Sequence, residues 1–433
     1  IALDCGIKAT EKVVYAKTKG VDFIICDHHL PAEEIPKAVA VLDPKRVDCS
    51  YPFDELSGCG VGFKLVQAYA QKNRMPFEQI LPLLDLLVVS IASDIVPLVG
   101  ENRILAYFGL QQLNSNPSLG LKTIIKISGI DKEITINDIV FRIGPRINAA
   151  GRVESGRKSV ELLTADEKCS AAGIASDINT FNDQRKKLDH DITEEAIRHI
   201  NQSELEPSKK TTVLFNANWH KGVIGIVASR LTESFYRPTI ILTESNGLAT
   251  GSARSVEGFD LYYAISQCSE FLENYGGHKY AAGLTLKIEN IEPFKQKFER
   301  IVRETIDDEM LTPQINIDAK IKLTDITPDL YHMLQKFAPF GPNNTIPVFM
   351  TEKVTNFIGT KRVGRNNEHL KLVIVDDTRA CNDRSGIGFG MGHLYDKVNS
   401  GGFFDICYTL QENEFMGKND IQMIVKDIRL REE

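Results

Sequence analysis

Two short apolar runs near the start of the chain each end in side chains that can bind a metal ion. Ile1–Leu3 is followed by Asp4, and Val21–Cys26 is followed by an Asp-His-His triplet at positions 27–29. A third apolar run lies at 38–42, and helical patterns follow at 60–72, 78–92 and 101–113. This alternation predicts a parallel sheet with crossover helices. Because parallel strands end at one edge of a sheet, where ligands commonly bind, we expect the polar residues to meet in one crevice.

A single carboxylate, Asp94, interrupts the apolar segment Val88–Leu98. Burying an unpaired charge is costly, so we expect Asp94 to be a ligand beside Asp4 and His28. The alternatives are a helix cap or a buried ion pair for Asp94, and a hydrogen-bonded surface residue for His28. Two carboxylates and one imidazole suit Mn²⁺ or Mg²⁺ better than an ion that prefers thiolates. Zinc is the weaker alternative.

The rest of the chain shows three further patterns. Residues 158–201 are nearly continuous helix formers without proline and predict one long connecting helix. A second α/β segment follows, with strands expected at 212–215, 239–243, 248–252 and 282–288 and helices at 223–234 and 293–307. Short strands expected at 315–321, 348–358, 370–375, 386–390, 404–410 and 421–428 indicate a small β-barrel. The predicted fold class is α/β with a C-terminal barrel.

Composition excludes several classes of protein. With 433 residues, 42% of them apolar, the chain is long enough for several globular domains. Its eight cysteines form no C-x-x-C pair, which predicts reduced thiols and no disulfide framework. The apolar segment 80–99 contains two aspartates, two serines and two prolines, so we expect no membrane span and a cytoplasmic protein. The net charge of −7 is weak evidence for or against DNA binding, which depends on local potential.

Four further motifs support a family resemblance. Residues 141–152 read FRIGPRINAAGR, residues 219–231 read WHKGVIGIVASRL, residues 276–278 read Gly-Gly-His, and residues 405–429 form a strand-rich C-terminal segment. With the Asp-His-His triplet, the chain resembles the DHH phosphoesterase superfamily and, within it, the RecJ single-strand DNA exonucleases. The resemblance implies a DHH catalytic domain at 1–113, a helical connector at 114–205, a DHHA1 substrate-binding domain at 206–309 and an OB-fold DNA-binding domain at 310–433.

The resemblance also implies roles for the first set of residues. Asp4 would bridge two metal ions, His28 and Asp94 would bind the second ion, His29 would contact a phosphate, and Asp27 would orient its neighbours. The family's Asp-x-Asp-Gly motif, which precedes the strand holding Asp4, is absent from this sequence. We therefore expect an N-terminally truncated chain that binds at most one Mn²⁺ or Mg²⁺ ion and has little activity.

Recognition of a strand end is assigned to a second set of residues. An exonuclease must bind a terminal phosphate, for which arginine and hydroxyl groups are well suited. By resemblance, the 5′-phosphate and DNA contacts are Arg146, Asn148, Arg152, Ser252, Arg254, His278 and His220. Lys361, Arg362 and Arg365 would line a track for the strand. The plainer alternatives are a solvated turn at 251–255, a helix cap at His220 and a solvated basic loop at 361–365.

The leading prediction is a metal-dependent 5′-3′ exonuclease that releases mononucleotides from single-stranded DNA in repair and recombination. One alternative is a nanoRNase or dinucleotide phosphodiesterase, for which a long connecting helix and a barrel would have no ligand. The other is an inactive single-strand DNA-binding scaffold, which would have no reason to keep the charged cluster. Family analogy adds a single-strand-binding protein and a helicase as partners, and we expect a monomer.

Overall fold

The computed structural model describes residues 1–202, 208–376, 383–415 and 418–431. The chain forms two compact units, and each combines segments that are distant in the sequence. The first unit contains residues 1–117, 134–139 and 315–433, and the second contains residues 118–133 and 140–314. No helix among the described residues is long and apolar enough to cross a membrane. The described cysteines are free, and Cys381 lies outside the described residues.

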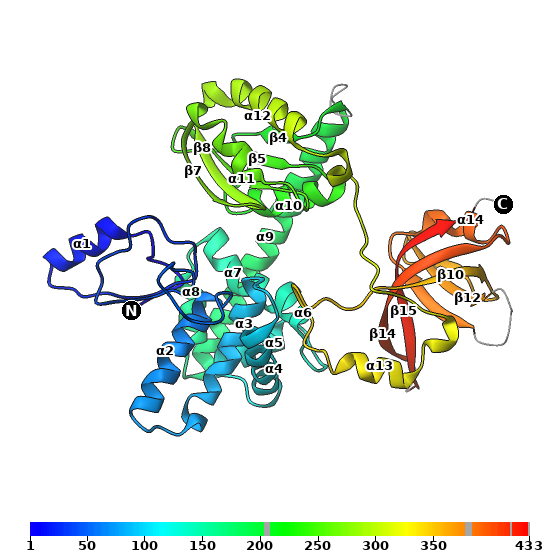
Figure 1. Cartoon of the computed structure of the whole chain (residues 1–433), viewed down its shortest axis with the longest axis horizontal. Coiled ribbons are helices and arrows are strands. Elements are labelled where there is room, and N and C mark those ends of the chain that lie inside the picture. Colours follow the sequence, from blue (N-terminus) through cyan, green and yellow to red (C-terminus); the bar gives the residue numbers. More distant parts are fainter. Residues whose placement is uncertain (203–207, 377–382, 416–417, 432–433) are drawn as a thin grey trace. The chain divides into compact units, whose positions relative to one another are not determined.

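The first unit begins with the predicted parallel sheet (Figure 1). Strands β1 (Ala2–Leu3), β2 (Ile24–Cys26) and β3 (Ala40–Leu42) lie in the order β1-β2-β3. Helix α1 (Thr10–Thr18), which was not predicted, connects β1 to β2. The expected helices α2 (Gly58–Lys72), α3 (Leu84–Ser93) and α4 (Gly100–Ser115) all follow β3, so they are not crossovers between the strands of this sheet. Ile25 and Cys26 are fully buried, and Cys26 packs with Leu56 and Val61 in one apolar cluster. This packing fixes the carboxyl ends of β1 and β2 beside the start of α2.

The C-terminal part of the first unit is a strand domain. Its strands are β9 (Ala319–Lys320), β10 (Phe349–Asn356), β11 (Lys361–Val363), β12 (His369–Asp376), β13 (Arg384–Gly388), β14 (Phe404–Phe415) and β15 (Lys418–Leu430). Strand β10 pairs with both β14 and β12, so the pairing β10-β14-β15-β13-β12-β10 closes on itself. A closed circuit of strand pairs is what the predicted barrel requires. The short helices α13 (Pro328–Gln335) and α14 (Tyr395–Val398) were not predicted.

A set of hydrogen bonds fastens the segment before β10 to the start of α4. The guanidinium of Arg103 donates to the backbone carbonyls of residues 336, 337 and 338. The backbone N–H of Leu98 donates to the carbonyl of Pro342 at 2.7 Å. These bonds join the C-terminal strand domain to the loop that follows Asp94.

The second unit contains a five-stranded sheet and a helical part. Strands β4 (Thr212–Phe215), β5 (Thr239–Ser245), β6 (Leu248–Arg254), β7 (Leu272–His278) and β8 (Ala281–Leu286) lie in the order β4-β5-β6-β8-β7. The helices are α5 (Leu119–Ile127), α7 (Gly144–Val153), α8 (Arg157–Leu163), α9 (Lys168–Gln202), α10 (Ile224–Phe235), α11 (Leu261–Ser266) and α12 (Ile291–Thr305). The short α6 (Ile136–Asp138) belongs to the first unit.

Two expectations about this unit are wrong in detail. The single helix expected at 158–201 is interrupted between α8 and α9. Thr164 ends α8 with its hydroxyl bonded to the carbonyl of Val160, and such local side-chain bonds compete with helix continuation. Strand β7 was not among the expected strands, although its glycines at 276 and 277 pair with Gly283 and Ala282 of β8.

Asp405 of β14 gives a prediction about the stability of the C-terminal strand domain. Its side chain is 2% exposed and accepts hydrogen bonds from Arg429, Arg431 and the backbone N–H of Lys353. Asp405→Asn is expected to lower the free energy of unfolding by about 2 kcal/mol, because two charge-assisted pairs are lost in a buried position. Thermal unfolding and hydrogen exchange along β14 would measure the loss. The exposed Asp420→Asn on β15 is the matched control and should change little.

The same residue predicts the direction of a pH effect. Burial alone raises the pKa of Asp405, but the bonds from Arg431 and Arg429 hold it below its usual value. The stabilisation is therefore present above a pH of about 4 and is lost as the pH falls through the lowered pKa. Equal acid sensitivity of the wild-type protein and Asp405→Asn would contradict this assignment.

Candidate metal centre and anion pocket

Asp4 follows β1 and turns its carboxylate toward the start of α2. Its backbone has a φ of 63°, a left-handed conformation that is uncommon outside glycine, and its N–H bonds the carbonyl of Cys26 at 2.9 Å. Gly58 makes the close approach possible, because a Cβ there would lie 2.3 Å from Asp4 Oδ1. The absence of a side chain at Gly58 therefore leaves the space that the carboxylate of Asp4 occupies.

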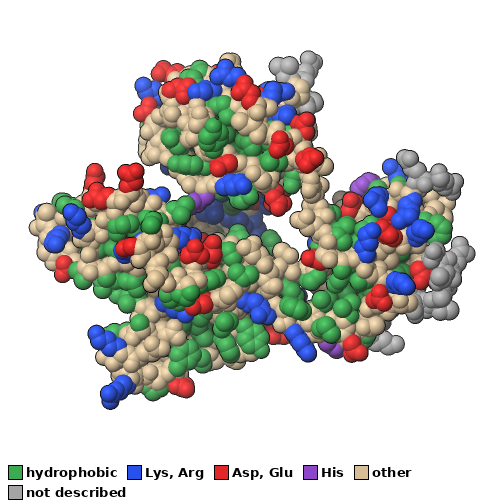
Figure 2. Space-filling view, viewed as in Figure 1, with side chains coloured by type: hydrophobic (Ala, Val, Ile, Leu, Met, Phe, Trp, Pro, Cys, Tyr) green, Lys and Arg blue, Asp and Glu red, His purple; other side chains and the backbone are tan. Residues whose placement is uncertain are grey.

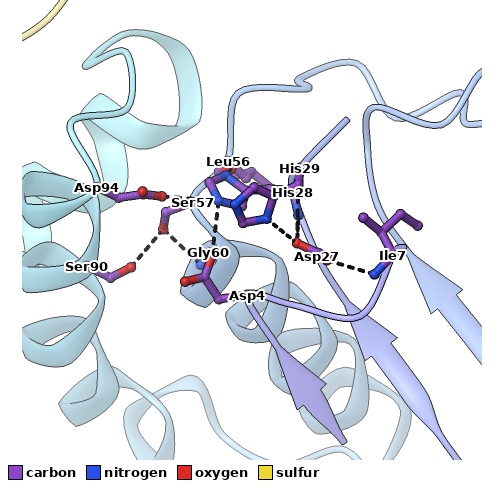
Figure 3. A network of polar contacts seen from close by, with 10 residues as sticks. All are labelled: Asp4, Ile7, Asp27, His28, His29, Leu56, Ser57, Gly60, Ser90 and Asp94. Atoms are coloured by element: carbon purple, nitrogen blue, oxygen red, sulfur yellow. Dashed lines mark hydrogen bonds and ion pairs between the residues drawn. The ribbon is translucent and has the colours of Figure 1, made fainter. Parts of the chain in front are cut away.

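The ring of His28 lies between two carboxylates (Figure 3). Its Nδ1 is 3.1 Å from the backbone carbonyl of Leu56, which can only accept, so Nδ1 carries a proton. Its Nε2 lies 3.1 Å from Asp4 Oδ1 and 3.3 Å from Asp94 Oδ2. The hydrogen bond to Asp4 raises the pKa of His28, and the charge of Asp94 adds to the rise. The Nε2 atom faces two negative oxygens, which is compatible only with an added proton or a cation at this point.

Asp27 accepts hydrogen bonds from both histidines. Its side chain is 1% exposed; Oδ1 accepts from the backbone N–H of His28 at 2.8 Å and from His29 Nδ1 at 2.7 Å, and Oδ2 accepts from the N–H of Ile7 at 2.9 Å. Burial alone raises the pKa of Asp27, but these hydrogen bonds, led by the one from His29, lower it below its usual value. Asp27 therefore stays ionised and fixes the proton of His29 on Nδ1.

The reason for expecting Asp94 in the site was wrong, although its position agrees with the expectation. Asp94 is not a buried charge inside an apolar segment: it ends α3, and its side chain is 38% exposed. Partial burial raises the pKa of Asp94, and the charge of nearby Asp4 adds to the rise. A carboxylate at the end of a helix, facing His28, is accessible to an ion from solvent.

The donor atoms at this edge fit a hard divalent cation. Asp4, His28 and His29 each offer a ligand atom, and these atoms lie within 4.8 Å of one another. Asp94 extends the set on the other side of His28. Carboxylate oxygens with imidazole nitrogens suit Mn²⁺ and, with more water ligands, Mg²⁺. The structure thus brings together every residue that the sequence suggested for metal binding.

The residues predicted to bind a terminal phosphate lie in the second unit. Arg254, at the end of β6, donates to the hydroxyl of Ser252 at 2.9 Å and to the carbonyl of Ala253 at 2.8 Å. Helix α10 passes so close that a Cβ at Gly225 would lie 3.0 Å from Ser252 Oγ and 3.2 Å from Arg254 Nη2. Burial lowers the pKa of Arg254, and the charge of Arg152 lowers it further. Two desolvated guanidinium groups that repel each other are typical of an anion site.

Most of the motif at 141–152 lies in helix α7, and residues 141–143 end the short π-helix before it. Arg152 donates to the carbonyl of Gly222 at 3.1 Å, so it reaches the start of α10. Arg146 donates to Asn179 Oδ1 and to the carbonyl of Arg142, and Asn148 is exposed. Of the two arginines, Arg152 is the one whose charge acts on Arg254, which places it beside the pocket.

The two predicted histidines of this unit lie in different settings. His220 Nδ1 accepts a hydrogen bond from the backbone N–H of Gly222 at 3.1 Å, but it does not cap α10, whose N-cap is Val223 and has no side-chain hydrogen bond. It still lies near Arg152, because a Cβ at Gly222 would meet both residues. His278 is exposed at the end of β7, opposite Ala281 and one strand away from Arg254.

The basic residues of the expected DNA track lie on the C-terminal strand domain. Lys361 and Arg362 belong to strand β11 rather than to a loop, and Arg365 is exposed just beyond it. Arg362 is engaged within the domain, with Nη2 2.7 Å from Asp396 Oδ2 and its guanidinium over the ring of Tyr395. Lys361 and Arg365 are the better candidates for a strand contact.

Sequence reasoning missed three residues near the anion pocket. Arg185 and Asp189 of α9 and Arg230 of α10 surround the position of Arg152. Burial lowers the pKa of Arg185. The spacing of Asn182, Arg185 and Asp189 within the apolar face of one helix was the available signal.

Comparisons with known proteins agree with this description. Three family models match: DHH family, N-terminal domain, at residues 1–91; DHHA1 domain at 208–304; and RecJ OB domain at 317–427. These ranges fall within the predicted domains, whose exact bounds stay a prediction.

The chain is also similar to curated proteins and to a solved structure. It is 36% identical to the single-stranded-DNA-specific exonuclease RecJ of Bacillus subtilis over 100% of this chain and 54% of that protein. It is 31% identical to RecJ of Salmonella typhimurium over 99% of this chain and 76% of that protein. The crystal structure of RecJ from Thermus thermophilus in complex with Mn²⁺ matches with a TM-score of 0.86 and 26% identity, covering 100% of this chain and 61% of that one. The chain thus spans about half the length of the Bacillus subtilis relative.

Proposed function

Because the chain belongs to the RecJ family of single-stranded-DNA-specific exonucleases, we propose that it contributes the metal centre and strand-end pocket of a metal-dependent 5′-3′ exonuclease. The products would be 5′-mononucleotides, and the role would be in DNA repair and recombination. One observation carries the proposal: His28 Nε2 points between the carboxylates of Asp4 and Asp94 at 3.1 and 3.3 Å. The Mn²⁺ in the Thermus thermophilus relative supports Mn²⁺ or Mg²⁺ as the ion.

The residues of the metal centre have distinct roles in this proposal. Asp4, His28 and Asp94 hold the ion, which when bound supplies a nucleophilic water and a counter-charge for the phosphate. The backbone carbonyl of Leu56 keeps the proton of His28 on Nδ1, so Nε2 faces the ion. Asp27 orients His29, whose Nε2 can donate to a non-bridging phosphate oxygen when protonated.

Recognition of the strand end is assigned to the second unit. Arg254, Ser252 and Arg152 present donors in a desolvated position and would bind a terminal 5′-phosphate. Asn148, Arg146, His220 and His278 are the proposed neighbours of this pocket, and Lys361, Arg362 and Arg365 are the proposed strand track. A continuing backbone carries a phosphodiester with one charge fewer, so this pocket favours an end over an internal position.

Substrate choice tests the function and separates it from the alternatives. Cleavage in Mn²⁺ should be measured on 5′-phosphorylated single strands, on duplexes and on dinucleotides. We expect single strands to be degraded from the 5′ end and duplexes to resist. Preference for dinucleotides would favour a nanoRNase, and strand binding without cleavage in Mn²⁺ or Mg²⁺ would favour a scaffold. A single-strand-binding protein and a helicase as partners, a monomer and a cytoplasmic location remain proposals by family analogy.

Gly58 gives a prediction that is specific to the packing of the metal centre. Gly58→Ala places a Cβ 2.3 Å from Asp4 Oδ1, so the carboxylate must move and Mn²⁺ affinity should fall by about tenfold or more. Isothermal titration calorimetry measures the affinity and the number of ions per chain. Gly60→Ala, on the same helix, is the matched control, because its Cβ would meet no atom closer than 3.3 Å. Equal Mn²⁺ affinities of the two variants would remove Asp4 from the site.

A further inference from the structure

The buried face of α9 is apolar at both ends and polar in the middle. Alanines and isoleucines are buried at both ends of this face, at Ala171, Ala175 and Ile178 and again at Ile192, Ala196 and Ile200. Between them, Asn182 and Asp189 are 0% and 1% exposed. Four buried polar atoms of this stretch have no hydrogen-bond partner among the described residues: Oδ1 and Nδ2 of Asn182, Nε of Arg185 and Oδ1 of Asp189. Burial of polar groups is costly, so a polar stretch inside an apolar face needs a functional reason.

Asp189 is the carboxylate at the centre of an arginine cluster. Its Oδ2 forms an ion pair with Arg230 Nη2 of α10 at 2.8 Å. Its charge acts on Arg152 of α7 and on Arg185 of its own helix, and Arg185 in turn feels the charges of Arg152 and Arg230. In Figure 2, basic side chains gather where Figure 1 draws α9. One buried carboxylate therefore pairs with a guanidinium group of α10, and its charge also acts on arginines of α7 and α9.

The cluster leads directly to the anion pocket. Arg152 contacts the start of α10 at the carbonyl of Gly222, Arg254 and Ser252 lie against the same helix at Gly225, and Asp189 pairs with Arg230 further along it. Asp189 is too deeply buried to meet a ligand itself, and a negative charge would repel a phosphate. Its carboxylate can, however, restrict the orientation of the neighbouring arginines, whose long side chains otherwise have many rotamers.

We propose that Asp189 is a positioning residue for the strand-end pocket: its carboxylate holds the guanidinium group of Arg230 on α10, the helix whose start Arg152 contacts at Gly222 and which lies against Ser252 and Arg254 at Gly225, so that the pocket is preorganised for a terminal phosphate. This inference rests on the proposed function of Arg254, Ser252 and Arg152. It adds a residue that makes no contact with the phosphate, and it assigns a reason for the polar interruption in α9.

Neutralising Asp189 distinguishes positioning from simple charge balance, because the two roles predict opposite changes in the affinity for phosphate. If Asp189 only compensates positive charge, Asp189→Asn leaves the pocket more positive and strengthens phosphate binding. If Asp189 positions the arginines, the isosteric asparagine frees them and weakens phosphate binding. We expect the affinity ratio of 5′-phosphorylated to 5′-hydroxyl single strands to fall by about tenfold. This is the lower end of the loss of affinity seen when a residue that orients the ligands of a bound ion is replaced.

The experiment is fluorescence anisotropy with the two oligonucleotides in EDTA, so that no strand is cut. Asp191→Asn, which removes an exposed carboxylate from the same helix, is the matched control and should keep the ratio. A double-mutant cycle with Arg230→Gln should show that the two replacements are not additive, since they break one ion pair. Arg230 is 54% exposed, so its replacement also reports on the pair if Asp189→Asn does not fold.

The outcomes separate this inference from the proposed function. An unchanged or increased ratio in folded Asp189→Asn, with a clear preference in the wild-type protein, overturns the positioning role and leaves the pocket intact. If Asp189→Asn does not fold, a wild-type ratio in Arg230→Gln overturns it equally. A wild-type protein that binds both oligonucleotides equally contradicts the pocket itself, before any variant is considered.

Discussion

Replacing His28 by alanine is expected to lower Mn²⁺ affinity at the metal centre by at least about 100-fold and strand cleavage by about 1000-fold or more. The ring of His28 lies within 3.3 Å of both Asp4 and Asp94, so its removal leaves two carboxylates without the donor between them. Isothermal titration calorimetry with Mn²⁺ measures the first effect, and release of nucleotides from a labelled single strand measures the second.

Two further replacements make this result specific. His190→Ala removes an exposed histidine on α9 and should leave both quantities unchanged. His29→Ala should reduce cleavage more than Mn²⁺ affinity if His29 contacts the phosphate, and should reduce both alike if it is a ligand, as its distance from Asp4 and His28 also permits. Undiminished Mn²⁺ binding by His28→Ala would place the ion elsewhere and remove the basis of the proposed chemistry.

The second large effect is expected at the strand-end pocket. Arg254→Gln should reduce the preference for 5′-phosphorylated over 5′-hydroxyl strands by about 10- to 100-fold, which corresponds to the loss of one charged hydrogen bond worth about 1.5 to 3 kcal/mol. The preference of Arg254→Lys should lie between those of the wild-type protein and Arg254→Gln, because an ammonium group keeps the charge but lacks the planar guanidinium geometry. Anisotropy measurements in EDTA give the preference without turnover.

The control for this variant is Arg303→Gln on α12. It removes the same charge from the same unit, but Arg303 is half-exposed and pairs with Glu299 at 2.8 Å. Long-range attraction between the strand and the protein changes equally in both variants, whereas only Arg254→Gln should alter the preference for a terminal phosphate. An equal loss of the 5′-phosphate preference in both variants would show that Arg254 contributes only general positive charge.

The parts of the fold with strong local patterns could be predicted from the sequence. Strand β4 was predicted at its observed bounds, and β2 and β3 were placed with a few extra residues, because short runs of apolar residues mark buried strands. The edge shared by Asp4 and His28 followed from the rule that parallel strands end together. Strand β7 was missed, since its Gly-Gly-His end has the composition of a turn and becomes a strand only by pairing with β8.

The pocket could be predicted only in part, because tertiary contacts decide the rest. The resemblance named Ser252, Arg254 and the arginines of α7. The positions of Arg185, Asp189 and Arg230 depend on how α7, α9 and α10 cross, which no local pattern contains. Asp94 shows the opposite case: the residue was in the right place for a reason that the structure does not support, since its carboxylate is partly exposed.

The hydrogen bonds of Leu98 and Arg103 give the two ends of the chain a thermodynamic connection. They tie the loop after Asp94 to residues 336–342, which lead into the C-terminal strand domain. An ion that reduces the mobility of the loop would therefore act on these hydrogen bonds. A nucleic acid that reduces the mobility of the C-terminal strand domain would act on the same bonds. Whatever free energy couples the two events, it has the same value in both directions, so each ligand would change the other's affinity by an identical factor.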